Sequence, residues 1–184
     1  MTELASDGQL RAAFIRWALV LVPGVLLLGL LSWQMGGSGP GNAWFAALAK
    51  PAIYPPPATF KIVWPILYVL MGIALAMIAA ARSARWRGPA MAAFTVQLLL
   101  NLAWSPLFFA AHQITAALIV VAVVDVAVLV TIVLFARVRP AAAWLLAPYL
   151  AWILFATALN YEFLRANPDA DGKANSGAVT RIEI

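Results

Sequence analysis

The stretch QLLLNLAWSPLFF, residues 97–109, is apolar enough for the middle of a membrane. It nevertheless carries a stripe of polar and aromatic residues: Gln97, Asn101, Trp104, Ser105 and Phe108. These fall at i, i+4, i+7, i+8 and i+11, which is one face of a helix. Three interpretations compete for such a stripe: hydrogen bonding between packed helices, a ligand pocket, or a path for a solute. Pro106 lies inside the run and should kink the helix, freeing a backbone carbonyl near Leu102.

The composition is that of a membrane protein. Of 184 residues, 65% are hydrophobic and only 10% are charged, and the mean hydropathy is +0.92. Soluble domains are roughly half apolar and about a quarter charged. The absence of cysteine excludes disulfides, thiolate metal sites and a cysteine nucleophile. The net charge of +5 comes mainly from arginines near the ends of apolar runs, so we expect headgroup contacts and no nucleic-acid partner.

Five stretches are long and apolar enough to cross a bilayer, which takes about 20 residues of helix. They cover approximately residues 14–35, 60–81, 89–110, 114–136 and 141–164. Backbone in hydrocarbon must hydrogen-bond internally. The pattern therefore predicts an all-α membrane protein, a five-helix transmembrane domain over residues 1–165. The polar segment 166–184 lacks periodicity, and we expect a disordered tail.

The first apolar run follows Arg11 and Arg16, as the core of a signal peptide also does. Its length exceeds the usual core of about 7–15 residues and no A-x-A site follows, so we expect a retained helix. With five spans, most arginines lie on one side of the membrane: Arg11, Arg16, Arg82, Arg85, Arg87, Arg137 and Arg139. The positive-inside rule then places the N-terminus in the cytoplasm and the long first connection outside.

That first connection has a structure of its own. The segment NAWFAALAK, residues 42–50, predicts a short amphipathic helix with Asn42 as its N-cap. A proline ends it, and three consecutive prolines stiffen the segment between this helix and the second span. An apolar, proline-braced loop over a helical bundle has the character of a lid. The alternative is a loop in the headgroup layer, anchored by Trp44 and Tyr54.

Two further spans carry stripes. In the second span one i+4 row is aromatic at first and small afterwards: Trp64, Tyr68, Gly72, Ala76 and Ala80. The small half predicts close helix packing. The aromatic half suits a planar ligand, unless its two residues belong to the interfacial aromatic belt. The last span repeats the pattern with Pro148, Trp152, Ala156 and Asn160. Hydrogen bonding between helices explains one asparagine easily, but it explains repeated asparagine–tryptophan stripes less well.

Two single residues have competing interpretations. Asp125 lies near the middle of the fourth span, where an aspartate costs roughly 2.5–3.5 kcal/mol on insertion scales. It either relays protons or contacts a substrate, or, as we favour, it forms a structural hydrogen bond to a neighbouring helix. His112, the only histidine, is either a ligand of haem iron or, as we favour, a solvated side chain at a helix end, because it lacks the carboxylate partner that metal ligands usually have. No nucleophile–base pair, phosphate loop or carboxylate pair is present, so the sequence indicates no catalytic or metal site.

Several motifs together resemble a known family. They occur in order between Trp44 and Arg165 and read WFAALAKPAIYPPP, VWPILYVLMG, QLLLNLAWSPLFF, VVDVAVLV and PYLAWILFATALNY. This combination is similar to the translocator protein family, TspO/MBR, whose members are also called tryptophan-rich sensory proteins or peripheral benzodiazepine receptors. The resemblance rests on separate motifs in register with five spans, whereas the first span matches in hydropathy alone.

The resemblance implies a pocket that the first loop closes, homodimers, and binding of porphyrins such as protoporphyrin and haem. In mitochondrial members it also implies sterols and synthetic drug ligands. No obligatory cofactor is implied. The pocket positions carry over onto Trp44, Tyr54, Trp64, Tyr68, Asn101, Trp104, Phe108, Trp152 and Asn160. The sterol motif carries over onto Leu159, Tyr161 and Arg165.

With this resemblance the pocket becomes the favoured interpretation of the opening stripe. Indole faces stack on flat rings, and asparagines supply the few oriented polar groups that such pockets need. Lys50, Lys61 and Arg165 lie on the predicted outer side, where porphyrin propionates can be met. We expect a receptor or translocator in a bacterial cell membrane, with a sensory or transport role. The alternative is light- and oxygen-dependent porphyrin degradation at the same pocket.

Overall fold

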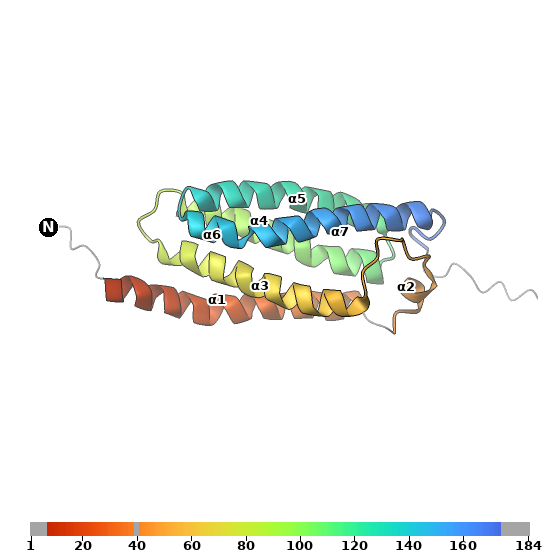
Figure 1. Ribbon diagram of the computed structural model, residues 1–184, viewed down its shortest axis with the longest axis horizontal. Coiled ribbons are helices and arrows are strands. Elements are labelled where there is room, and N and C mark those ends of the chain that lie inside the picture. Colours follow the sequence, from red (N-terminus) through yellow and green to blue (C-terminus); the bar gives the residue numbers. More distant parts are fainter. Residues whose placement is uncertain (1–6, 39–40, 174–184) are drawn as a thin grey trace, which may run out of the picture.

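The computed structural model describes residues 7–38 and 41–173 and consists of helices laid side by side (Figure 1). The elements are α1 (Asp7–Gly36), α2 (Ala43–Ala47), α3 (Pro57–Ala80), α4 (Arg87–Ser105), the π-helix η1 (Pro106–Ala110), α5 (Ile114–Ala136), α6 (Pro140–Leu145) and α7 (Ala147–Ala166). Within these residues, five helical stretches are long and apolar enough to span a membrane: Gly8–Gly36, Pro57–Ala80, Arg87–Ala110, Ile114–Ala136 and Pro140–Ala166. The predicted all-α fold with five spans is confirmed.

The third and fifth spans are less regular than the sequence predicts. At Pro106 the third span changes from the α-helix α4 to the π-helix η1. Proline has no N–H, so the carbonyl of Leu102 loses its helical donor. Ser32 on α1 replaces that donor, with its Oγ 2.6 Å from the Leu102 oxygen. The freed carbonyl is therefore confirmed, and Pro106 changes the helix type at the predicted place. The last span is interrupted at Leu146, between α6 and α7.

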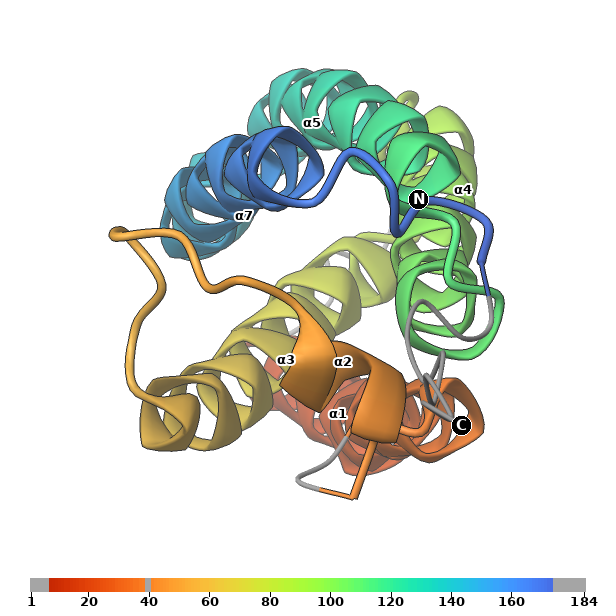
Figure 2. The same ribbon diagram turned by 90° about the vertical axis from the view of Figure 1, so that its right-hand side faces the viewer.

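The helices follow one another around the bundle in the order α1, α3, α7, α5 and α4 when it is viewed end-on (Figure 2). The closest neighbours are α1 with α3, α4 with α5, and α5 with α7, whereas α3 and α7 scarcely contact each other. The predicted small-residue packing holds at Gly72. A Cβ there would lie only 2.6 Å from Val22 Cα, so the absence of a side chain lets α1 and α3 approach closely.

The first connection covers one end of the bundle, which we call the lid end, and residues 41–56 form the lid. Asn42 caps α2 as predicted, because its Oδ1 accepts a hydrogen bond of 2.8 Å from Phe45 N. Trp44 is only 7% exposed and faces the bundle. The chain then passes the end of α7 on its way to α3 (Figure 2). The lid interpretation is therefore the correct one for Trp44, and a headgroup anchor is not.

The segment after α7 holds the lid in place. Ala49 N donates to Asn167 Oδ1 at 2.8 Å, and Asn167 Nδ2 donates back to the Ala49 oxygen at 3.0 Å. Further along, Gly172 N donates to the His112 oxygen at 2.8 Å, and Asp171 accepts hydrogen bonds from Thr115. Residues 167–173 are thus bonded to the bundle, which differs from the disorder predicted from residue 166 onward. The rest of the predicted tail, 174–184, lies outside the described residues.

Candidate functional site

An aromatic cluster fills the lid end of the bundle, directly beneath α2. Phe108 on η1 is its centre and is almost fully buried. Trp104 stacks on Phe108 with ring centroids 5.1 Å apart, and Trp44 of the lid meets it edge-on at 5.7 Å. Trp44 also stacks on His112, with ring centroids 4.5 Å apart. His112 is therefore part of an aromatic stack, and no group of potential metal ligands is found among the described residues.

A row of aromatic rings leads from this cluster to the side of the bundle. Its members contact each other in the order Phe45, Tyr54, Phe60 and Trp152, with centroid separations of 6.0, 5.8 and 5.7 Å. Phe45 and Tyr54 come from the lid, Phe60 from α3 and Trp152 from α7. Burial raises the pKa of the Tyr54 phenol, so this ring stays neutral at physiological pH. The row thus links the lid with the two helices α3 and α7.

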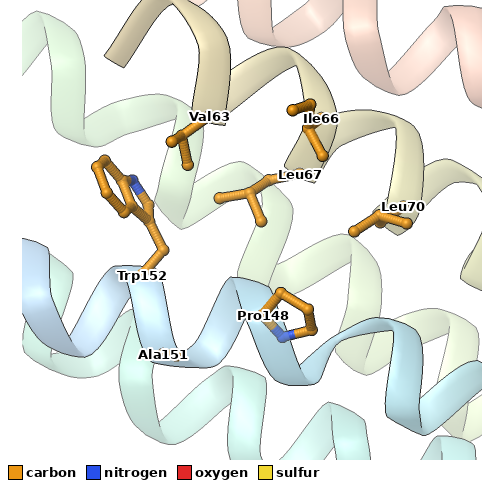
Figure 3. Close-up of a pocket in the computed structure, with 7 residues that line it drawn as sticks. All are labelled: Val63, Ile66, Leu67, Leu70, Pro148, Ala151 and Trp152. Carbon is orange, nitrogen blue, oxygen red and sulfur yellow. The ribbon is translucent and has the colours of Figure 1, made fainter. Parts of the chain in front are cut away.

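The row ends at an apolar cleft between α3 and α7, which we call the lateral cleft (Figure 3). Its volume is about 460 Å³, and it is lined by Val63, Ile66, Leu67, Leu70, Pro148, Ala151 and Trp152. The indole of Trp152 lies at one end of the cleft. Its N–H is buried and has no hydrogen-bond partner. A buried donor without an acceptor is costly, and it is the kind of oriented polar group that fixes a ligand in an apolar site.

The polar residues of the stripes hydrogen-bond between helices. Tyr68 Oη on α3 donates to Asn101 Oδ1 on α4 at 3.1 Å. Trp104 Nε1 donates to Asn160 Oδ1 on α7 at 3.0 Å, and Asn160 Nδ2 donates to the Ile114 oxygen at 3.1 Å. Hydrogen bonding between helices therefore accounts for Asn101 and Asn160 in this structure. A ligand that enters among these rings must displace or share those bonds.

Gln97 and Asp125 are further polar residues inside the bundle. Gln97 Oε1 accepts a hydrogen bond of 3.0 Å from the Tyr149 hydroxyl. Asp125 Oδ2 accepts one of 2.8 Å from Thr157 on α7. This is the interhelical hydrogen bond favoured from the sequence. Asp125 Oδ1 and Gln97 Nε2 are buried without partners, so neither residue is fully satisfied.

The structure divides the nine predicted ligand positions among three places. Trp44, Tyr54, Trp104, Phe108 and Asn160 meet at the lid end. Trp64, Tyr68 and Asn101 lie where α3 meets α4, with the rings of Trp64 and Tyr68 stacked at 5.3 Å. Trp152 lies apart from both, at the lateral cleft. The aromatic row connects the first place with the third.

The sterol motif is not assembled on one surface. Leu159 is buried in the aromatic cluster, whereas Tyr161 is 51% exposed on the outside of α7. Arg165 is also exposed, lies over the Tyr161 ring and forms a 3.1 Å ion pair with Glu162. Residues two apart on a helix point in different directions, so the motif cannot present all three side chains to one ligand.

Sequence reasoning missed three residues that complete the aromatic cluster and row: Phe45, Phe60 and Phe163. Phe163 contacts the rings of Tyr54 and Phe108 at 5.7 and 5.8 Å. Its spacing of three residues from Asn160 was a usable signal, because residues three apart share a helix face. Phe45 and Phe60 carried no such signal, because the fold of the lid determines what they contact.

The basic residues at the lid end differ in whether other groups of the protein already engage their charge. Lys50 Nζ donates to the oxygens of Phe45 and Leu48 and lies 4.3 Å from the Phe45 ring centroid, and burial lowers its pKa. Arg165 is paired with Glu162. Lys61, on the second turn of α3, is exposed and makes no hydrogen bond or ion pair within the described part of the chain. Lys61 is thus a cation at the lid end that no described side chain neutralises.

Comparison with known proteins agrees with this architecture. Residues 19–165 match the model of the TspO/MBR family. The chain is 36% identical over 133 residues to the tryptophan-rich protein TspO of Chlorobaculum tepidum, an alignment covering 70% of this chain and 82% of that protein. It is 39% identical over 138 residues to the human translocator protein, covering 70% and 78% of the two chains. A tryptophan-rich sensory protein of Cereibacter sphaeroides is 36% identical over 126 residues, covering 68% of this chain and 78% of that relative. The match extends from the first span to the end of the last one, so this multi-pass membrane protein belongs to the TspO/MBR family.

Proposed function

We propose that this protein binds porphyrins, such as protoporphyrin or haem, among the aromatic side chains between the lid and the lateral cleft, and that it senses the ligand or passes it on. The observation that carries the proposal is the row of rings from Phe45 to Trp152. It begins in the lid and ends in an apolar cleft between α3 and α7. The relatives named tryptophan-rich sensory protein and translocator protein support the same two roles.

Ring geometry favours a flat ligand. Offset-stacked and edge-to-face aromatic contacts are each worth about 0.5–1.5 kcal/mol beyond simple burial. A planar macrocycle inserted into the row replaces ring–ring contacts with contacts of the same kind. The unpaired N–H of Trp152 gains a partner if it meets the ligand. Lys61 is exposed near the same end and suits a propionate, with which a charge-assisted hydrogen bond forms.

Orientation and location are part of the proposal. Arg11, Arg16, Arg82 and Arg139 lie at the end of the bundle opposite the lid. Because basic residues are retained on the cytoplasmic side, the lid faces away from the cytoplasm. In a bacterial cell membrane the ligand would then have two possible entrances. It would enter the lateral cleft from the bilayer, or it would enter at the lid end from outside the cell.

The test is a titration of the purified protein with protoporphyrin IX in detergent, following tryptophan emission. Trp152→Ala removes a ring of the row without breaking any hydrogen bond of the indole, because that N–H has no partner. We expect its affinity to fall about tenfold, the upper end of one aromatic contact. Trp144→Ala is the matched control, since Trp144 is 78% exposed on α6. Its affinity should equal that of the wild type.

Linear quenching, or equal affinities in all three proteins, would mean that porphyrin only partitions into the micelle, and the proposal would be abandoned. If binding is specific, vesicles with and without the protein distinguish transport from sensing. Spectra recorded in the dark and under illumination test the alternative chemistry. A new absorbing product under light, lost in Trp152→Phe, would assign degradation in place of sensing or passage.

A further inference from the structure

A second cavity lies at the end of the bundle opposite the lid. Its volume is about 880 Å³. Three separate segments form it: the first turns of α1, the end of α3 with the connection to α4, and the connection from α5 to α6. The first turns of α1 project past the end of α3 and make one wall (Figure 1). We call it the arginine groove, because each segment contributes one arginine: Arg16, Arg82 and Arg139.

No described acidic side chain pairs with any of these three guanidinium groups, and the ion pair Arg165–Glu162 lies at the other end of the molecule. Neighbouring arginines outside the groove are engaged differently. Arg87 Nε donates to the Ala79 oxygen at 3.0 Å, and Arg137 lies 4.8 Å from the Trp86 ring centroid. The groove therefore concentrates positive charge that the described protein does not neutralise.

Most of the lining between the arginines is apolar, with Gln9 and Ser83 as its polar members. The apolar lining comes from Leu10 and Ala13 of α1, Met77 of α3 and Val138 on the third segment. Leu10 is 43% exposed, and α1 continues from there as an exposed apolar surface suited to lipid tails. A ligand of this groove must be anionic at one end and apolar at the other. A soluble phosphate ester satisfies the arginines but leaves the apolar walls in contact with water.

We propose that the arginine groove binds the headgroup of an anionic phospholipid, with the phosphate between Arg16, Arg82 and Arg139 and the start of an acyl chain along α1. Guanidinium groups bind phosphate oxygens with two parallel hydrogen bonds, which makes arginine suited to this contact. Basic pockets between transmembrane helices bind lipid headgroups in this way. The site is at the opposite end from the porphyrin site, so it does not depend on the function proposed above.

The experiment is native mass spectrometry of the full chain released from detergent that contains equal amounts of phosphatidylglycerol and phosphatidylcholine. We expect the wild type to retain one phosphatidylglycerol in preference to phosphatidylcholine. Arg16→Gln, Arg82→Gln and Arg139→Gln, made singly, should each lower that preference about fivefold. Arg11→Gln is the control: it removes the same charge from the same helix, but Arg11 does not line the groove.

The outcomes separate the sources of the effect. Equal retention of both lipids by the wild type overturns the proposal, and so does an equal loss in Arg11→Gln and the groove variants, because general surface charge would then suffice. Displacement of phosphatidylglycerol by glycerol 3-phosphate would overturn the lipid assignment and give the groove to a soluble phosphate ester. Because the arginines are replaced one at a time, a variant that fails to fold leaves the other two to decide. A preference that falls only in the groove variants, and survives glycerol 3-phosphate, supports the lipid site.

Discussion

Ser32 shows how a single hydroxyl can stabilise a break in a membrane helix. Pro106 removes the N–H that would bond the carbonyl of Leu102, and Ser32 Oγ supplies a donor from α1 at 2.6 Å. In hydrocarbon no water can take that place. The freed carbonyl was predictable because proline always has this effect. Its partner was not, because one serine in an apolar run carries no periodic signal, and only the packing of α1 against α4 brings the two together.

Ser32→Ala should destabilise the folded protein by about 0.6–1.7 kcal/mol, the range for interhelical hydrogen bonds in membranes. Pro106→Ala restores an N–H at position 106, which can bond the Leu102 oxygen within the helix. In the Pro106→Ala background the same serine substitution should cost close to nothing. Unfolding by sodium dodecyl sulfate in mixed micelles, followed by circular dichroism, measures all four proteins of this cycle. Equal costs in both backgrounds would show that Ser32 acts through some other contact.

Among the elements, α1 and α3 form the closest pair of the bundle. The row Gly72, Ala76 and Ala80 predicted a close contact from sequence, since small residues at i+4 spacing let backbones approach. The partner helix was not predictable, because the apolar sequence of α1 contains no comparable row of small residues at i+4 spacing. The structure shows that Val22 of α1 fills the space above Gly72.

Gly72→Ala is expected to cost about 1–3 kcal/mol, because the new Cβ would lie 2.6 Å from Val22 Cα and the two helices must move apart. Gly24→Ala is the matched substitution on the partner helix. A Cβ at Gly24 meets nothing within 4 Å, so the change should be neutral or stabilise by up to about 1 kcal/mol through helix propensity. Thermal unfolding of both variants in the same detergent tests the pair. A loss of similar size in both would contradict the packing argument.

At the scale of the whole molecule, the bundle is closed at the lid end and open along one side. The lid is held by the paired hydrogen bonds between Ala49 and Asn167, while α3 and α7 leave the lateral cleft between them. The sequence predicted a lid only as one of two alternatives, because a loop's composition does not determine what it covers. No pattern in the sequence indicated the cleft, which results from two neighbouring helices that contact each other at only a few residues.

This asymmetry predicts the route of the ligand. If porphyrin enters from the bilayer, Ala151→Phe should obstruct the lateral cleft and slow association about tenfold, which corresponds to a barrier increase of about 1.4 kcal/mol. Ala122→Phe adds the same ring on the exposed face of α5, a helix that does not line the cleft, and should leave the rate unchanged. Stopped-flow quenching of tryptophan emission gives both rates.

The lid route makes the opposite prediction. If porphyrin enters there, Asn167→Ala, which breaks both hydrogen bonds to Ala49, would accelerate association, and Ala151→Phe would have no effect. Because one variant alters the cleft and another the lid contact, the two rates measured together identify the entrance.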